Sequence, residues 1–350
     1  MRSRLITEIS RDSKIGQVII TWPILYSGAM SKKTIAIVTI KDDIHAHAVR
    51  HELLSSTNIN CQLLEVDRLS STHHISWQMI NKKTQATILT DKGERLPLEA
   101  IDLVWWRRSR SQQIFDDKWY EPNQEDVINN DCRSTFLGTF LTSFKGKWIS
   151  HPTATERAGN KLYQLSIAKQ NGFQVPKTLI SQCPEDVRRF CESNKHGTIV
   201  KTVAGGGRGL FLFTKFVTKD LLANNESIEV CPAIYQEYVP GTKHIRLNCF
   251  GDSSYAAIIE SEELDWRPNL SVPVSPWNVP KKLHNQVRRI LDLLELEIGV
   301  IDLKIDLSGT IFWLEVNPQG QFLFLEPLTK MPLTKLFCDY LVSQMSNLNR

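Results

Sequence analysis

The sequence lacks paired cysteine motifs, long apolar runs, internal repeats and any large excess of charge. Its seven cysteines are an odd number and form no Cys-x-x-Cys pair, which argues against a disulfide framework or a zinc site and favours reduced thiols in the cytoplasm. A formal net charge of only +4 gives no broad basic signature of nucleic-acid binding. The apolar stretch at 16–30 is interrupted by Pro23 and is too short to span a membrane.

What is present is an ordinary globular composition, with 41% hydrophobic and 23% charged residues in a chain of 350. That length is sufficient for two or three domains. Met30 is followed by Ser-Lys-Lys and then by a β-branched run, and so resembles a start of translation. We therefore expect residues 1–30 to be a disordered tail or a mis-assigned upstream extension, with a targeting segment as the alternative.

The first half of the sequence has the pattern of a parallel sheet. A β-branched strand at 34–40, a helix at 43–54 and a second strand at 61–67 form a βαβ unit. A meander follows, and then a buried strand at 101–108 that ends in two arginines. We assign residues 31–130 to one α/β domain and 131–175 to a connecting segment with a helix at 153–172, ended by Gly172.

The second half is predicted to contain two further units. In residues 176–240, a strand at 197–203 runs into a glycine-rich turn and a second strand, which together predict a flexible hairpin flap. Residues 241–350 contain antiparallel strands, an amphipathic helix at 279–298 ended by Gly299, a hairpin and a short C-terminal helix at 334–344.

The hairpin places acidic side chains at the end of an apolar strand. If Ser308 and Gly309 form a two-residue turn, Asp302 lies opposite Glu315, with Cβ atoms about 5 Å apart. Strict alternation then puts Trp313, Glu315 and Asn317 on one face. Two adjacent carboxylates repel each other, and a magnesium ion with its preference for oxygen ligands would remove that repulsion. A solvated acidic face, or neutralisation of the pair by Lys304, is the alternative.

The order of four segments carries a resemblance to a known family. IVKTVAGGGRG, YQEYVPGTKHIR, DLK and WLEVNPQGQ occur in the order typical of the ATP-grasp superfamily. Over residues 33–340 the chain resembles more closely the graspetide macrocyclases, which are microviridin-type peptide ligases, and more distantly the ribosomal-protein glutamate ligases. This resemblance implies an α/β (α+β) ATP-grasp fold, with a pre-ATP-grasp domain followed by two ATP-grasp subdomains.

The resemblance also implies an activity. An ATP-grasp ligase would use ATP and Mg²⁺ to convert a carboxylate into an acyl phosphate, join it to an amine or hydroxyl, and release ADP and phosphate. Its partner would be a precursor peptide, with no nucleic acid and no membrane, and the enzyme could form a homodimer. A ligase that adds an amino acid to a protein or small metabolite, and a non-catalytic ATP-binding sensor, remain the alternative functions.

Individual residues match the motifs of the family. The resemblance implies magnesium ligands at Asp302, Glu315 and Asn317 and catalytic arginines at Arg246 and Arg267. It implies nucleotide contacts at Lys161, Lys201, Gly205, Gly206, Gly207, Gln236, Glu237, Tyr238 and Val239. Relatives often carry an acid for the ribose near this place, where the chain has Lys243 and His244, so a ribose contact by an acid is in question. His244 itself could donate a hydrogen bond to the nucleotide, with a structural histidine as the alternative. Arg107 and Arg108 could receive a substrate carboxylate or could simply form a basic strand end in solvent.

Overall fold

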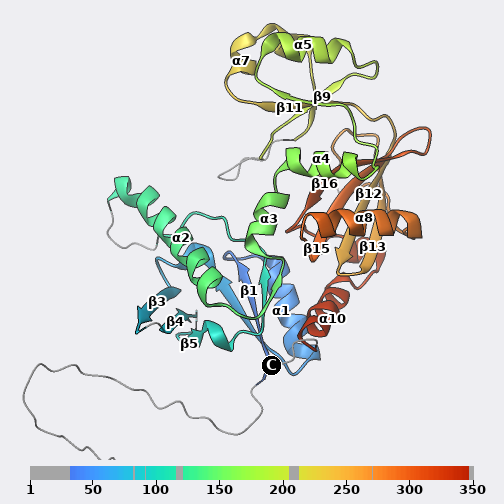
Figure 1. The fold of residues 1–350 in the computed structure, drawn as a ribbon. Helices are drawn as coiled ribbons and strands as arrows, with labels where there is room; N and C mark the ends of the chain where they lie inside the picture. The colour runs from blue at the N-terminus through green and yellow to red at the C-terminus, as the bar shows by residue number, and fades with distance from the viewer. Residues whose placement is uncertain are drawn as a thin grey trace, which may run out of the picture. The chain divides into compact units, whose positions relative to one another are not determined.

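The computed structural model describes residues 32–81, 83–90, 92–115, 121–204, 213–269 and 271–346 (Figure 1). The proposed extension at 1–30 and the flap glycines Gly205, Gly206 and Gly207 lie outside these residues. Within the described residues, no helix is both long and apolar enough to cross a membrane.

The first sheet is parallel and has four strands in the order β2-β1-β6-β7. Its strands are β1 (Thr34–Thr39), β2 (Asn60–Glu65), β6 (Leu103–Trp106) and β7 (Lys147–Ile149). Helix α1 (Ile44–Ser56) connects β1 to β2, which confirms the predicted βαβ unit. A small antiparallel sheet follows β2, as the meander pattern predicted. It consists of β3 (His74–Ile80), β4 (Lys83–Leu89) and β5 (Arg95–Pro97).

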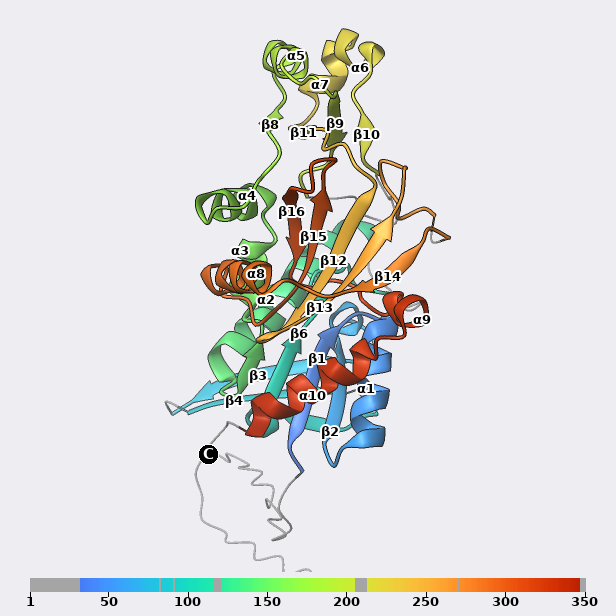
Figure 2. The same ribbon diagram turned by 90° about the vertical axis from the view of Figure 1, so that its right-hand side faces the viewer.

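Helices from distant parts of the chain cover both faces of the parallel sheet. On one face, α1 packs beside α10 (Leu333–Ser346), so the C-terminal helix returns to the N-terminal sheet (Figure 2). On the other face lies α2 (Glu125–Ser143), whose Phe136 and Phe140 pack against Trp106. The sequence analysis did not identify α2, although its aromatic side chains four residues apart are typical of a helix packed on a core.

A second sheet is antiparallel and has the strand order β10-β9-β11-β8. Its strands are β8 (Thr178–Ser181), β9 (Thr198–Lys201), β10 (Lys215–Phe216) and β11 (Ala233–Glu237). Three helices cover it, namely α5 (Pro184–Glu192), α6 (Lys219–Ala223) and α7 (Asn225–Glu229). Val187, Ile228 and Tyr235 form the small core between the helices and the sheet.

The third sheet has five antiparallel strands in the order β14-β13-β12-β15-β16. Its strands are β12 (Lys243–Phe250), β13 (Ser253–Glu260), β14 (Val274–Trp277), β15 (Ile298–Ile305) and β16 (Ile311–Asn317). Helices α4 (Lys161–Gln170) and α8 (Lys281–Leu293) pack on one face, around a core that contains Val287, Leu303 and Trp313 (Figure 1). On the opposite face, one part packs on the N-terminal core through Phe250, Ala257 and Ile298, and another part carries polar side chains such as Arg246 and Asp302.

Two helices differ from the sequence prediction. The helix predicted at 153–172 consists of α3 (Pro152–Ala158) and α4, because the Asn160 side chain accepts a hydrogen bond from the Tyr163 N–H and starts a new helix. The helix predicted at 279–298 ends at Leu293, and Gly299 belongs to β15. A Cβ at Gly299 would lie 2.9 Å from Val316 Cγ2 and 3.0 Å from Leu291 Cδ2, so this glycine permits close packing of helix on sheet and does not end the helix.

Candidate active site

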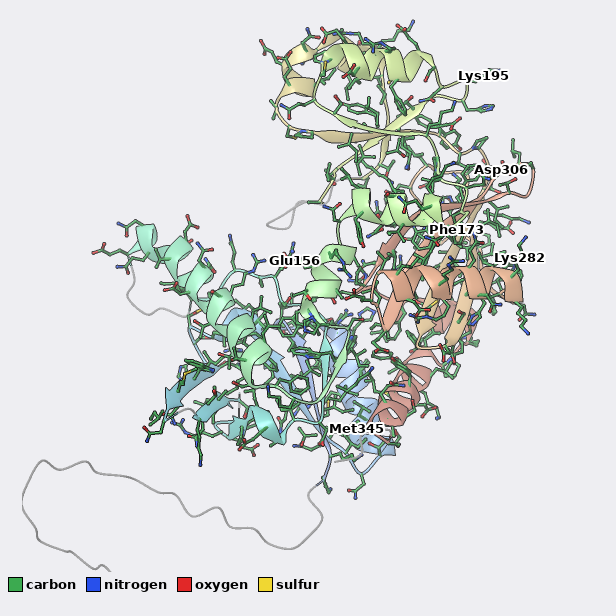
Figure 3. The ribbon with its side chains drawn as sticks, viewed as in Figure 1. Glu156, Phe173, Lys195, Lys282, Asp306 and Met345 are labelled. Carbon is green, nitrogen blue, oxygen red and sulfur yellow. The ribbon has the colours of Figure 1, made fainter. Side chains whose placement is uncertain are left out.

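The β15–β16 hairpin brings Asp302 directly opposite Glu315, as predicted, but the turn and the strand pairing between them differ from the prediction. The turn contains three residues, because the Asp306 N–H donates to the Thr310 carbonyl and Gly309 adopts a φ of +86° (Figure 3 labels Asp306). The assumption of a two-residue turn was therefore wrong. A β-bulge between Asp302 and Leu303 inserts one extra residue into β16 and restores the predicted pairing.

The bulge also changes which residues share a face. Trp313 is fully buried in the core and packs edge-on against Phe173, with ring centroids 5.2 Å apart. Leu314 and Glu315 line a cavity on the opposite side of the sheet, and Val316 points back into the core. The prediction that Trp313 and Glu315 share a face was therefore wrong, because the extra residue interrupts the alternation of side chains.

That cavity, here called the first cavity, has a volume of about 430 Å³. Side chains of β9, β11, β12, β15 and β16 contribute to its wall. It gathers most of the residues singled out in the sequence: Lys161, Lys201, Gln236, Glu237, Tyr238, Val239, His244, Arg246, Arg267, Asp302 and Glu315. Residues separated by more than 150 positions along the chain are thus brought around one space.

The two carboxylates are neutralised by basic neighbours. On β12, next to β15, Arg246 donates from one terminal nitrogen to both oxygens of Asp302, at 2.8 Å each. Lys161 Nζ lies 3.1 Å from Glu315 Oε2. Burial and the neighbouring Glu315 raise the pKa of Asp302. Burial opposes ionisation of Glu315 as well, but the charges of Lys161 and Lys201 hold its pKa below the ordinary value.

Asn317 lies at the end of β16 and lines a different cavity from Asp302 and Glu315. Its Oδ1 accepts a hydrogen bond of 2.9 Å from the Gln319 N–H, which orients the amide. An amide oxygen has two lone pairs, so one remains for a cation. Among the described residues, no group of three or more His, Cys, Asp or Glu could hold a metal, so a cation here depends on two carboxylates and this amide.

The lining of the first cavity contains two more of the predicted cations. Lys201 donates to Gln236 Oε1 at 3.1 Å, and Gln236 in turn donates to Thr178 Oγ1 at 2.8 Å. Burial lowers the pKa of Lys201 to about 8. Arg267 is paired with Asp265, through a 2.7 Å bond from Nε to Oδ1, and its guanidinium lies 5.9 Å from the Phe213 ring. The sequence analysis assigned a role to Arg267 but none to Asp265.

The end of β11 and the two residues after it form another wall. The Glu237 and Tyr238 N–H groups donate to the carbonyls of Lys177 and Gly197, while Val239 is buried against the cavity. Lys304 Nζ lies over the Tyr238 ring at 4.9 Å, so this lysine does not neutralise the acid pair. Burial lowers the pKa of Lys304 to about 8.

His244 is buried nearby, and its Nε2 has no hydrogen-bond partner within the described part of the chain. Burial and the charge of Lys304 lower its pKa to about 4, so the ring is neutral at physiological pH. A neutral imidazole that lines the cavity can donate or accept one hydrogen bond, as a ribose hydroxyl would require.

A second cavity, of about 450 Å³, lies beside the first and shares Lys161 with it. Asn317 and Gln319 line this second cavity together with a charged cluster. In that cluster, Arg110 pairs with Glu156, and Arg133 lies 3.8 Å from the same carboxylate. Figure 3 labels Glu156, which comes from α3, whereas Arg133 comes from α2. The sequence analysis missed this cluster, because nothing in a local motif places α2 beside α3.

The two predicted substrate arginines have a different environment from Arg110. Arg107 is fully buried, and its guanidinium donates hydrogen bonds of 2.6 and 3.1 Å to the carboxylate of Asp43. Arg108 is 34% exposed, and its Nε lies 3.7 Å from the same carboxylate. Neither belongs to the described lining of the two cavities. A buried ion pair of this kind favours a structural role for Arg107, and Arg110 is the arginine after β6 that reaches the second cavity.

Comparisons with known proteins support an ATP-dependent site. Residues 158–341, a little over half of the chain, match the model of the RimK-like ATP-grasp domain. The structure is similar to the macrocyclase MdnC of Microcystis aeruginosa bound with its precursor peptide MdnA, with 25% identity and a TM-score of 0.79 over 89% of this chain and 99% of that one. It is also similar to a RiPP-associated ATP-grasp ligase of Chryseobacterium gregarium in complex with ADP and a leader and core peptide.

The values for the Chryseobacterium structure are 25% identity and a TM-score of 0.78, over 89% of this chain and 97% of that one. Among curated proteins, the alpha-aminoadipate–LysW ligase LysX of Sulfurisphaera tokodaii is 21% identical over 214 residues, which cover 57% of this chain and 72% of that protein. The two structural similarities extend well beyond the family match, and therefore include most of the N-terminal sheet.

Proposed function

Because the chain belongs to the RimK-like ATP-grasp family and is an ATP-grasp ligase, we propose that it crosslinks side chains within a ribosomally made peptide. The electrophile would be an aspartate or glutamate side chain of that peptide. The nucleophile would be a lysine amine, which gives an amide, or a serine or threonine hydroxyl, which gives an ester. Two structural neighbours that share 89% of this chain are complexes with peptides, which supports a peptide as the substrate.

The observation that carries the proposal is the arrangement of the two cavities around Lys161. Four further cationic side chains line the first cavity, Lys201, Arg246, Arg267 and Lys304, and this positive lining suits the triphosphate of ATP. The second cavity, at 450 Å³, is large enough for a side chain and opens beside Asn317. A carboxylate that enters from the second cavity would meet the γ-phosphate at Lys161.

The residues present fit a magnesium ion. Asp302, Glu315 and the Asn317 amide offer only hard oxygen ligands, and Mg²⁺ commonly takes one or two carboxylates and completes its shell with water and phosphate oxygens. When bound, the ion would neutralise charge on the transferring phosphoryl group. Asp302 and Glu315 would hold it, and Arg246 and Lys161 would turn from the carboxylates toward phosphate oxygens.

The chain's own residues would then act in two steps. In the first, an oxygen of the substrate carboxylate attacks the γ-phosphorus, the bond to the bridging oxygen breaks, and ADP leaves. Arg246 and Arg267 would donate hydrogen bonds to the phosphoryl oxygens, whose negative charge they offset. In the second, the amine attacks the acyl carbon, the carbon–oxygen bond to phosphate breaks, and the amine proton leaves with the phosphate. Closure of both cavities would exclude water from the acyl phosphate.

Intact mass measurement of peptides tests this function. The protein would be expressed with the genes that surround its own, as wild type and as Glu315→Ala. We expect peptides that have lost one water for each new bond, and only with the wild-type protein. A gain in mass equal to one amino acid less one water would refute intramolecular crosslinking and indicate addition of an amino acid, the chemistry named for the LysX relative. An unchanged mass in every peptide would refute a peptide substrate.

A further inference from the structure

The loop that follows Asn317, residues 318–323, is hydrogen-bonded to one candidate magnesium ligand on β16 and to an arginine on the neighbouring strand β12. The Gln319 N–H donates to Asn317 Oδ1 at 2.9 Å. The Gln321 carbonyl accepts a 2.9 Å hydrogen bond from Arg246, the residue that also holds both oxygens of Asp302. The position of this loop therefore sets the orientation of one candidate magnesium ligand and of the arginine beside another.

The far side of the same loop is held by a histidine of the N-terminal sheet region. His45 Nε2 lies 3.0 Å from the Phe322 N and 3.1 Å from the Leu323 N, and therefore accepts from both backbone N–H groups. Its ring meets the Phe322 ring edge-on, with centroids 5.2 Å apart. Both side chains are buried, so the contacts lie away from water. His45 and Phe322 are separated by 277 positions in the sequence.

His45 is itself rigidly placed. Asp43 caps α1 by accepting from the His45 N–H at 3.2 Å, and it also forms the buried pair with Arg107. Arg107 donates a long bond of 3.4 Å to the Gln319 carbonyl of the loop. Burial and the charge of Arg107 lower the pKa of His45 to about 4, so the ring is neutral at physiological pH, with Nε2 free to accept.

We infer that His45 is a positioning residue for the magnesium-nucleotide site, which it serves by fixing the backbone of Phe322 and Leu323. This inference rests on the function proposed above. Residues outside the ligand set that orient ligands typically change metal affinity by about 10- to 100-fold when they are lost. The N-terminal sheet would thus be part of the nucleotide site, although the residues matched to the family model begin only at 158.

Three variants test the inference. His45→Leu keeps most of the side-chain bulk and removes the acceptor, whereas His45→Gln keeps an acceptor oxygen close to the position of Nε2. His47→Leu changes an exposed histidine two residues further along α1 and is the matched control. If His45→Leu fails to fold, His45→Asn replaces it. The asparagine side chain is polar but too short to place an acceptor at the position of Nε2.

The readouts are calorimetric binding of ADP with Mg²⁺ and with EDTA, and hydrogen exchange of the peptide that spans residues 319–325. For His45→Leu we expect ADP affinity in Mg²⁺ to fall by roughly 10- to 100-fold, ADP affinity in EDTA to stay within about threefold, and loop amides to exchange faster. His45→Gln should recover most of the affinity, and His47→Leu should match the wild type.

Two results would overturn the inference. One is an unchanged affinity for ADP in Mg²⁺ despite faster exchange of the loop. The other is an equal loss of affinity in Mg²⁺ and in EDTA, which would indicate a general structural role. The failure of the proposed function itself looks different, because it would appear in the peptide masses, whereas these readouts depend only on ADP binding and loop exchange.

Discussion

Substitution of Glu315 by glutamine removes one negative charge from the candidate metal site and leaves the side-chain shape almost unchanged. In the folded protein the substitution removes the 3.1 Å ion pair between Glu315 and Lys161. The side chain of Lys161 is 24% exposed and that of Glu315 is 29% exposed. A partly exposed pair is worth up to about 1 kcal/mol. The substitution also removes the repulsion from Asp302 across the hairpin, which acts in the opposite direction.

The free energy of unfolding should therefore change by less than about 1 kcal/mol, which corresponds to a shift in Tm of at most about 4 °C. Catalysis should respond far more strongly. Loss of a carboxylate ligand removes about 3–4 kcal/mol of stabilisation from the transferring phosphoryl group, and at 1.36 kcal/mol for each factor of ten this is a decrease in rate of about 10²- to 10³-fold.

The assay compares release of ADP by the purified Glu315→Gln protein, with its peptide identified by mass measurement, and the Tm of the same sample. Glu297→Gln is the matched control, because Glu297 forms an ion pair of similar exposure with Lys147 and lines neither cavity. We expect that control to release ADP at the wild-type rate. Wild-type ADP release by Glu315→Gln would refute the assignment of the metal site, and a fall in Tm of more than about 10 °C would refute the reasoning about stability.

Two further predictions concern the site and its scaffold. Burial lowers the pKa of Lys201 to about 8, so its positive charge is present below pH 8 and lost above it. The Kd of the wild-type protein for ADP without metal should therefore rise about tenfold from pH 7 to pH 9, and the Kd of Lys201→Gln should be independent of pH in this range. Equal pH profiles of the two proteins would contradict the assignment of Lys201 to the nucleotide site. Trp313→Ala should lower the free energy of unfolding, measured by chemical denaturation, by about 3–5 kcal/mol, because Trp313 is fully buried in the core. Leu314→Ala, on the cavity side, should lower it clearly less. Equal losses of stability in the two variants would contradict the side-chain orientations that the bulge produces.

Local sequence patterns predicted many elements but not all of their ends. The βαβ unit follows from β-branched runs and helical spacing, and the structure confirms it. The ends of helices were predicted less well, because Gly299 was interpreted as a helix stop and is in fact a close contact between helix and sheet. A glycine permits several backbone conformations and close approaches, and only the neighbouring elements show which one is used.

The opposition of Asp302 and Glu315 was predicted correctly through two errors that cancel. The turn is one residue longer than assumed, and the bulge adds one residue to the partner strand. The orientation of Trp313 could not have followed from the sequence, because strict alternation of side chains holds only in a strand without a bulge.

The sequence by itself determined the family motifs and many, but not all, of the polar residues of the first cavity, because each motif keeps its chemistry within a few consecutive positions of a strand or turn. Only the tertiary structure decided that Arg107 is paired with Asp43, that Arg110, Arg133 and Glu156 meet in a second cavity, and that His45 holds the loop after Asn317. Those contacts join elements far apart in the chain, such as α1 and the segment after β16. Local periodicity carries no information about such pairings, which depend on how the sheets and helices pack.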